Sequence, residues 1–130
     1  MTTRDYEKKA DGLIQEVCTF YGVCLMCGST YAVGGHHIVK KGQCRGSRYW
    51  MRHDPRNLIP VCWNPCHQWC DTHPDELLMW LKENNQEVYK WRANQLALPM
   101  DGTASIRTTE YLRETIRSLT SLLTSLSSSS

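Results

Sequence analysis

The sequence lacks the long apolar segments that mark membrane and secreted proteins. No run of about 18 apolar residues occurs in the chain, so we expect no membrane-spanning helix. The first residues, MTTRDYEKKADG, contain no apolar stretch of the signal-peptide kind. We therefore expect an intracellular, cytoplasmic protein whose cysteine thiols stay reduced.

The net charge is also small, only +2, so the chain as a whole lacks the basic excess of a strong nucleic-acid binder. The basic residues are unevenly distributed, however, because Asp54 is the single acid between residues 40 and 56. That stretch is basic at Lys40, Lys41, Arg45, Arg48, Arg52 and Arg56. The segment is either a solvated loop or a surface that binds DNA phosphates.

Hydrophobic periodicity predicts helices at both ends of the chain and extended segments in the middle. Helical spacing of apolar residues indicates helices over residues 4–21, within 74–98 and over 101–126. The segment TYAVGGHHIVK favours a β-hairpin that turns at Gly34 and Gly35, and NLIPVC favours a further extended segment. We expect an α+β fold with one domain over residues 1–100 and a disordered serine tail over 127–130.

The last predicted helix has an apolar seam with 4-3-4-3 spacing, as in a short coiled coil. The seam consists of Leu112, Ile116, Leu119, Leu123 and Leu126. It favours either a homodimer through this helix or packing of the helix against its own domain.

Seven cysteines in a reduced compartment favour metal binding over disulfides. Cys24 and Cys27 form a C-x2-C pair, and Cys62 and Cys66 form a C-x3-C pair. Two such pairs can place four thiolates around a structural zinc ion, the alternative being buried core cysteines. The longer second spacing leaves the fourth ligand open, because Cys70 lies one helical turn beyond Cys66. Asn64-Pro65, between the second pair, also has the form of a helix N-terminus.

Five fragments in this order, CLMCG, GGHHIV, DPRNLIPVC, CHQW and HPDELLMWL, lie within about residues 22–82. Together they resemble the HNH endonucleases, also called the His-Me finger or ββα-metal family, and in particular their zinc-containing branch. The resemblance implies a ββα-metal core over residues 22–73, with a structural zinc knuckle and metal-dependent cleavage of DNA. The segment RYWMRHDPRN is also similar to small phage-type members, some of which act on recombination intermediates. The protein would then be phage-encoded, act in a bacterial host and cut branched DNA.

The resemblance assigns different roles to the adjacent histidines of GGHHIV, whose side chains should point to opposite faces of a strand. His37 would be the general base that takes a proton from water, and a neutral imidazole suits that role near pH 7. His36 and His67 would bind the catalytic metal. Asn57 would tie the loop to the hairpin through its side-chain amide, or it is a simple turn residue.

The third protein ligand of that metal is left open between two residues. Asp71 lies four residues after His67, so a helix places both on one face. His73 is the alternative, although it precedes Pro74, where helical geometry is disfavoured. We expect Mg²⁺ or Mn²⁺ at this site, and imidazole ligands would also accept Ni²⁺ or Zn²⁺.

Arginine contacts to phosphates position DNA without reading its bases, so we expect low sequence specificity. A competing hypothesis is a zinc-ribbon module that binds DNA or protein and catalyses nothing. It explains the cysteines and the basic segment but leaves the positions of the histidines unexplained. An inactive relative of the nucleases is a third possibility.

Overall fold

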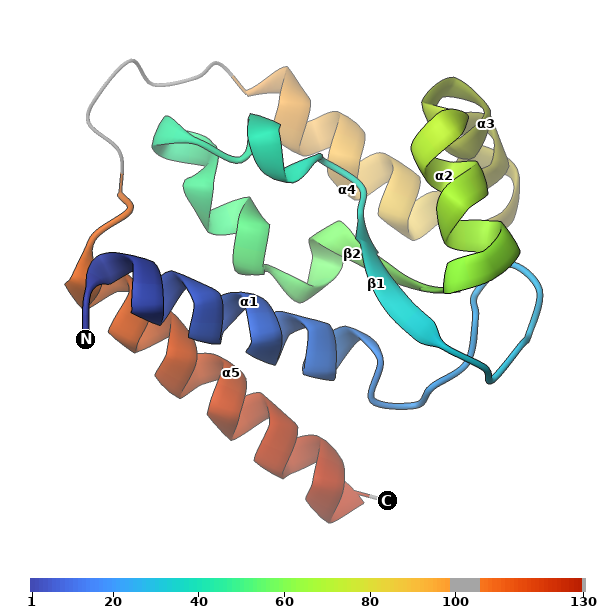
Figure 1. Cartoon of the computed structure of the whole chain (residues 1–130). Coiled ribbons are helices and arrows are strands. Elements are labelled where there is room, and N and C mark those ends of the chain that lie inside the picture. Colours follow the sequence, from blue (N-terminus) through green and yellow to red (C-terminus); the bar gives the residue numbers. More distant parts are fainter. Residues whose placement is uncertain (99–105, 130) are drawn as a thin grey trace.

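Helices make up most of the fold, and one pair of strands lies among them (Figure 1). The computed structural model describes residues 1–98 and 106–129. The helices are α1 (Thr3–Cys18), α2 (Gln68–Thr72), α3 (Pro74–Asn84), α4 (Gln86–Ala97) and α5 (Thr109–Ser129). The strands are β1 (Val33–His37) and β2 (Leu58–Cys62), and short helical turns lie between and after them: η1 (Lys41–Gln43), η2 (Gly46–His53), η3 (Pro55–Asn57) and η4 (Trp63–His67). The predicted α+β class is confirmed at this level.

Helix α1 begins at a capping box in which the Thr2 and Asp5 side chains each accept a hydrogen bond from the other's backbone N–H. It ends at Cys18, three residues before the predicted end. Gly22 then adopts a φ of +64°, in the left-handed region that favours glycine, and turns the chain toward the first cysteine pair.

The predicted hairpin within residues 30–40 is wrong. Gly34 and Gly35 lie inside β1, which pairs antiparallel with β2 so that Val33 lies opposite Cys62. The strands are joined through the whole basic segment instead of a tight turn. The double glycine resembles a turn signal, but at Gly35 it permits close packing.

Helix α1 packs closely against β1 at that position. A Cβ atom built on Gly35 would lie 2.9 Å from Leu58 Cδ2, 3.0 Å from Gln15 Oε1 and 3.1 Å from Cys18 Sγ. Separations this short are not tolerated without displacement of a neighbour, so a residue with a side chain at this position would displace Leu58, Gln15 or Cys18.

Helices α1 and α5 lie side by side in Figure 1, on the opposite side of the strands from α3. Their N-terminal ends meet where the Thr3 and Thr109 hydroxyls lie 2.8 Å apart. Leu112 and Leu119 of the predicted seam are buried in this contact, Leu119 together with Ile14. These two seam positions therefore pack within the chain itself.

Helix α5 also continues through residues 127–129, which we predicted to be a disordered tail. The Ser128 hydroxyl donates a hydrogen bond to the Thr124 carbonyl oxygen, 3.0 Å away, in the manner of serine within a helix. Residues 101–105, predicted as the start of this helix, and residue 130 lie outside the described residues. No helix among the residues described is both long and apolar enough to cross a membrane.

Candidate metal centres

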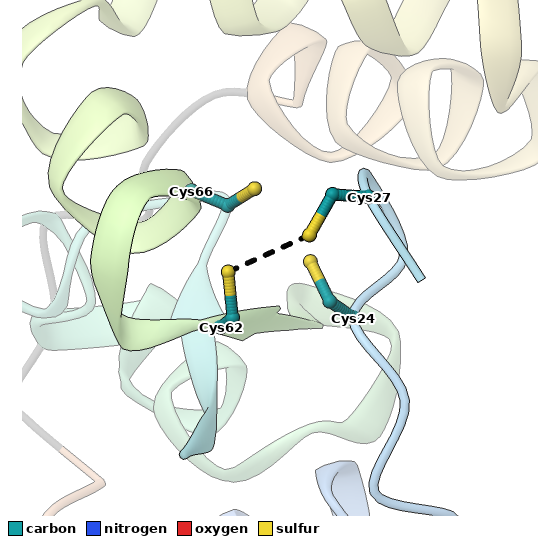
Figure 2. A group of neighbouring side chains, drawn as sticks. All are labelled: Cys24, Cys27, Cys62 and Cys66. Atoms are coloured by element: carbon teal, nitrogen blue, oxygen red, sulfur yellow. Dashed lines mark hydrogen bonds between the residues drawn. The ribbon is translucent and has the colours of Figure 1, made fainter. Parts of the chain in front are cut away.

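Four cysteine side chains converge beside the end of β2 (Figure 2). Cys24 and Cys27 come from the turn after α1, and Cys62 and Cys66 come from β2 and η4. Their four sulfur atoms all lie within 4.8 Å of one another, and Cys27 Sγ is 3.6 Å from Cys62 Sγ. A tetrahedral zinc site with Zn–S bonds of about 2.3 Å separates its sulfurs by about 3.8 Å. The cluster could therefore hold a zinc ion.

The electrostatics of the cluster favour a bound cation. Burial alone would raise the pKa of Cys24, but backbone hydrogen bonds from Cys62, Cys27 and Met26 outweigh it and lower the pKa to about 6. Burial and the three neighbouring cysteines raise the pKa of Cys66 far above its usual range. Four thiolates cannot accumulate here by themselves, and a divalent ion would offset their repulsion.

Cys70, the alternative fourth ligand, does not join the cluster. Its Sγ atom lies 3.6 Å from Met26 Sδ in the apolar core, and burial raises its pKa to about 11. The extra residue of the C-x3-C spacing is taken up at Asn64, which has extended backbone angles within η4. The helix predicted from Asn64-Pro65 therefore begins only at Gln68, and Cys66 faces the other three sulfurs.

A second cluster joins His36 of β1 to His67 and Asp71, which lie one helical turn apart. His36 Nδ1 lies 3.5 Å from Asp71 Oδ1, and His67 Nδ1 lies 3.2 Å from Asp71 Oδ2. The two imidazole rings meet edge to face, with centroids 5.1 Å apart. One nitrogen from each histidine and one carboxylate oxygen could bind a single divalent ion.

Two properties of the histidines fit metal binding. Burial and the neighbouring His67 lower the pKa of His36 to about 4, so its imidazole is neutral and keeps a free electron pair near pH 7. His67 Nδ1 is buried and makes no hydrogen bond to any residue of the described segments, although Asp71 is near. A buried polar atom without a hydrogen bond is costly unless another ligand satisfies it.

His73, the alternative to Asp71, does not join this cluster. Its Nδ1 lies 2.8 Å from the Thr72 hydroxyl and 3.0 Å from the Trp69 carbonyl oxygen, and its ring stacks on the Trp69 indole. The proline after His73 ends α2 and starts α3, so the side chain lies at a break between helices.

His37 lies beside the second cluster and has a defined tautomer. Its Nε2 is 2.9 Å from the Arg52 carbonyl oxygen. A carbonyl only accepts, so Nε2 donates the proton and Nδ1 keeps the electron pair. Burial lowers the pKa of His37, which favours this neutral form near pH 7.

His36, His37, His67 and Asp71 line one cavity of about 420 Å³. The two adjacent histidines thus contribute to the same cavity, although strand alternation alone predicts opposite faces. The cavity is also lined by Gln15, Gly35, Lys40 and Lys41.

Asn57 is fully buried and joins two parts of the loop. Its Oδ1 accepts a hydrogen bond from the Val39 N–H at 2.7 Å, and its Nδ2 donates to the Val39 and Met51 carbonyl oxygens, both at 3.0 Å. The side chain thereby ties η2 to the segment that follows His37.

The six basic residues of the loop divide into two groups. Lys40, Lys41 and Arg45 are exposed. The other three residues bond within the chain through their guanidinium groups: Arg48 with the Leu96 and Leu98 carbonyls, Arg52 with Asp11, and Arg56, which is also exposed, with Asp54. The first group is better placed to bind phosphate than the second.

Three residues that line the cavity or bond to the loop beside it were not identified from the sequence: Gln15 and Asp11 of α1, and His53 of η2. Gln15 bonds to the Gly35 backbone, and Asp11 binds both Arg52 and His53. The sequence signal for Asp11 and Gln15 is their i, i+4 spacing, which is also typical of an exposed helix face.

Comparisons of the chain with protein-family models, curated proteins and solved structures found no match. Its function is therefore inferred from the clusters described above.

Proposed function

We propose that the protein is a metal-dependent DNA endonuclease of the HNH type. In this proposal β1, β2 and α2 form the ββα-metal core, and the four cysteines hold a structural zinc ion. His36, His67 and Asp71 hold the catalytic ion, and His37 is the general base.

One observation carries the proposal: a candidate base and a candidate metal cluster line the same cavity. His37 presents an unprotonated Nδ1, and its neighbour His36 belongs to the His/Asp cluster. Hydrolysis of a phosphodiester needs both a base for water and positive charge near the phosphate. Neither group alone would distinguish a nuclease from a metal-binding module.

The side chains that line the cavity suggest separate roles in cleavage. His37 Nδ1 accepts the proton of the attacking water while Nε2 stays bonded to the Arg52 carbonyl. A divalent ion on the His/Asp cluster would neutralise charge on the scissile phosphate and on the departing oxygen. Lys40 and Lys41, which line the cavity, hold the flanking phosphates.

The exposed residues predict weak sequence preference. Lys40, Lys41 and Arg45 can neutralise phosphates, and such contacts do not read base edges. We expect affinity for DNA to fall steeply with salt and to vary little with base sequence.

The test is a plasmid-nicking assay with the purified protein in Mg²⁺, Mn²⁺ or EDTA, alongside His37→Ala. We expect metal-dependent nicking that EDTA stops and that His37→Ala reduces by about 10²–10⁴-fold, the usual contribution of a general base. Zinc content, measured by elemental analysis, should not change in the variant.

Full activity in His37→Ala would show that another residue is the base. DNA binding without cleavage in any metal would instead identify a zinc-ribbon binding module. Junction, flap and linear duplex substrates tested in parallel would reveal whether branched DNA is preferred.

A further inference from the structure

Helix α1 lies outside the segment that resembles a nuclease, yet one of its polar side chains lines the candidate site and another binds the adjoining loop. Asp11 and Gln15 are four residues apart and share one face of the helix. Gln15 lines the cavity, whereas Asp11 binds the loop that contacts His37. The two side chains therefore hold the strand that carries the adjacent histidines and the loop that contacts them.

Gln15 holds the strand just before His36. Its Oε1 accepts a hydrogen bond from the Gly35 N–H at 2.8 Å, and its Nε2 donates to the Gly35 carbonyl oxygen at 3.1 Å. One amide thus pairs with both backbone groups of a single residue, as a neighbouring strand would. The absence of a side chain on Gly35 lets α1 come close enough for these bonds.

Asp11 holds the loop residue that sets the tautomer of His37. Its carboxylate accepts two hydrogen bonds from the Arg52 guanidinium, at 2.9 and 2.7 Å, and a third from His53 Nε2 at 2.8 Å. The carbonyl of Arg52 accepts the hydrogen bond from His37 Nε2. Asp11 is thereby connected to His37 through one residue, Arg52.

The Asp11 carboxylate is ionised at neutral pH. Burial would raise the pKa of Asp11, but the hydrogen bonds from Arg52 and His53 outweigh it and hold the pKa well below its usual range. Bidentate pairing of arginine with a carboxylate restricts orientation as well as distance. The Arg52 side chain is therefore anchored to α1, and the backbone carbonyl of the same residue is the group that His37 contacts.

We propose that Asp11 and Gln15 are positioning residues of the nuclease site. Gln15 holds the strand that carries His36, and Asp11 holds the carbonyl that keeps the proton of His37 on Nε2. The inference rests on the proposed function of the same site. Without Asp11 the loop that carries the Arg52 carbonyl is held less firmly, and His37 populates its other tautomer, in which Nδ1 carries the proton and cannot act as a base.

The first test reads the tautomer directly, without DNA. Long-range ¹H–¹⁵N NMR spectra distinguish the two neutral forms of each imidazole, and the His37 signals are assigned by their loss in His37→Ala. We expect the Nε2–H form in the unmodified protein and a mixture of tautomers in Asp11→Ala. Ile14→Val, a buried change in the same helix that leaves both polar side chains in place, should keep the original tautomer.

The second test is cleavage kinetics with Asp11→Ala and Gln15→Glu. Gln15→Glu keeps the size of the side chain but places a carboxylate oxygen against the Gly35 carbonyl. We expect kcat to fall about ten- to a hundredfold in both variants, the scale of a small misplacement of reacting groups. KM for DNA and zinc content should not change, and Ile14→Val should keep the original kcat.

An unchanged tautomer in Asp11→Ala, or unchanged kcat in both variants, would overturn the positioning role. A fall in kcat that Ile14→Val matches at equal thermal stability would also overturn it, because loss of stability would then explain the effect. If the unmodified protein does not cleave DNA, the proposed function fails. The tautomer measurement still decides in that case whether Asp11 controls His37.

Discussion

The two metal-ligand clusters lie at the same sheet but differ in chemistry and in access to solvent. The cysteine cluster offers four sulfur ligands, and three of them, Cys24, Cys62 and Cys66, are buried. The His/Asp cluster offers three ligands and borders a cavity, and the Asp71 side chain is 55% exposed. Structural zinc sites use four protein ligands, whereas catalytic sites keep a position open for water or substrate. The contrast fits the proposed structural role of the first cluster and the proposed catalytic role of the second.

The clusters are also joined in the chain, because Cys66 and His67 are consecutive. The turn η4 directs the first side chain to the sulfurs and the second to His36 and Asp71. A zinc ion on the cysteines would therefore help to position His67, and we expect the reverse dependence to be weak. Substitutions in each cluster test this dependence, starting with the largest expected effect.

Removal of a thiolate should unfold the protein. Cys66→Ala leaves three ligands, and structural zinc contributes on the order of 10 kcal/mol to the folding of small domains, as much as the total stability of most. We expect circular dichroism to show loss of helix and elemental analysis to show little zinc. Cys70→Ala, one helical turn away and also buried, should keep the fold and about one zinc per chain. The opposite pattern would make Cys70 the fourth ligand.

Removal of a candidate ligand from the second cluster should leave the fold intact and lower only the affinity for the metal ion. Asp71→Asn replaces an exposed carboxylate with an amide of the same shape. We expect Mn²⁺ affinity, measured by calorimetry on the zinc-containing protein, to fall by at least about 10–100-fold, the range found for supporting residues of metal sites. Thermal stability without Mn²⁺ should stay close to that of the unmodified protein.

His73→Gln is the matched control, since His73 was the alternative ligand. It should leave Mn²⁺ affinity unchanged, because the His73 ring is held by Thr72 and Trp69 away from the cluster. Loss of affinity in His73→Gln but not in Asp71→Asn would reverse the assignment.

Sequence reasoning predicted the members of the two clusters better than the contacts that hold them. Cysteine spacing predicted the four sulfurs, with Cys70 left as an alternative to Cys66. The i, i+4 relation of His67 and Asp71 placed both on one helix face, with His73 left as an alternative to Asp71. The partnership of Asp11 with Arg52 was missed because residues 41 positions apart in the chain leave no local pattern. Arg52 was predicted to bind DNA on charge alone, and charge does not reveal that an acidic side chain of the same protein, Asp11, pairs with it.

Gly35 illustrates the same limit and provides the third and smallest effect. Its sequence context predicts a turn, whereas the structure places it where α1 meets β1. An added methyl group would lie within 3.1 Å of Leu58, Gln15 and Cys18. Gly35→Ala should lower the free energy of unfolding by about 1–3 kcal/mol through overpacking, as measured by urea denaturation. It should also displace Gln15 and reduce kcat without loss of zinc.

Gly34→Ala is the control for this change, one residue away in the same strand. A Cβ at Gly34 meets no atom within 4 Å, so the methyl group fits without displacement. Alanine also restricts the unfolded chain more than glycine does, and Gly34→Ala should be neutral or more stable by about 0.4–1 kcal/mol. Equal destabilisation by both substitutions would mean that β1 needs glycine for its backbone alone. The close approach of α1, and with it the contact between Gln15 and the strand of His36, would then lose its main support.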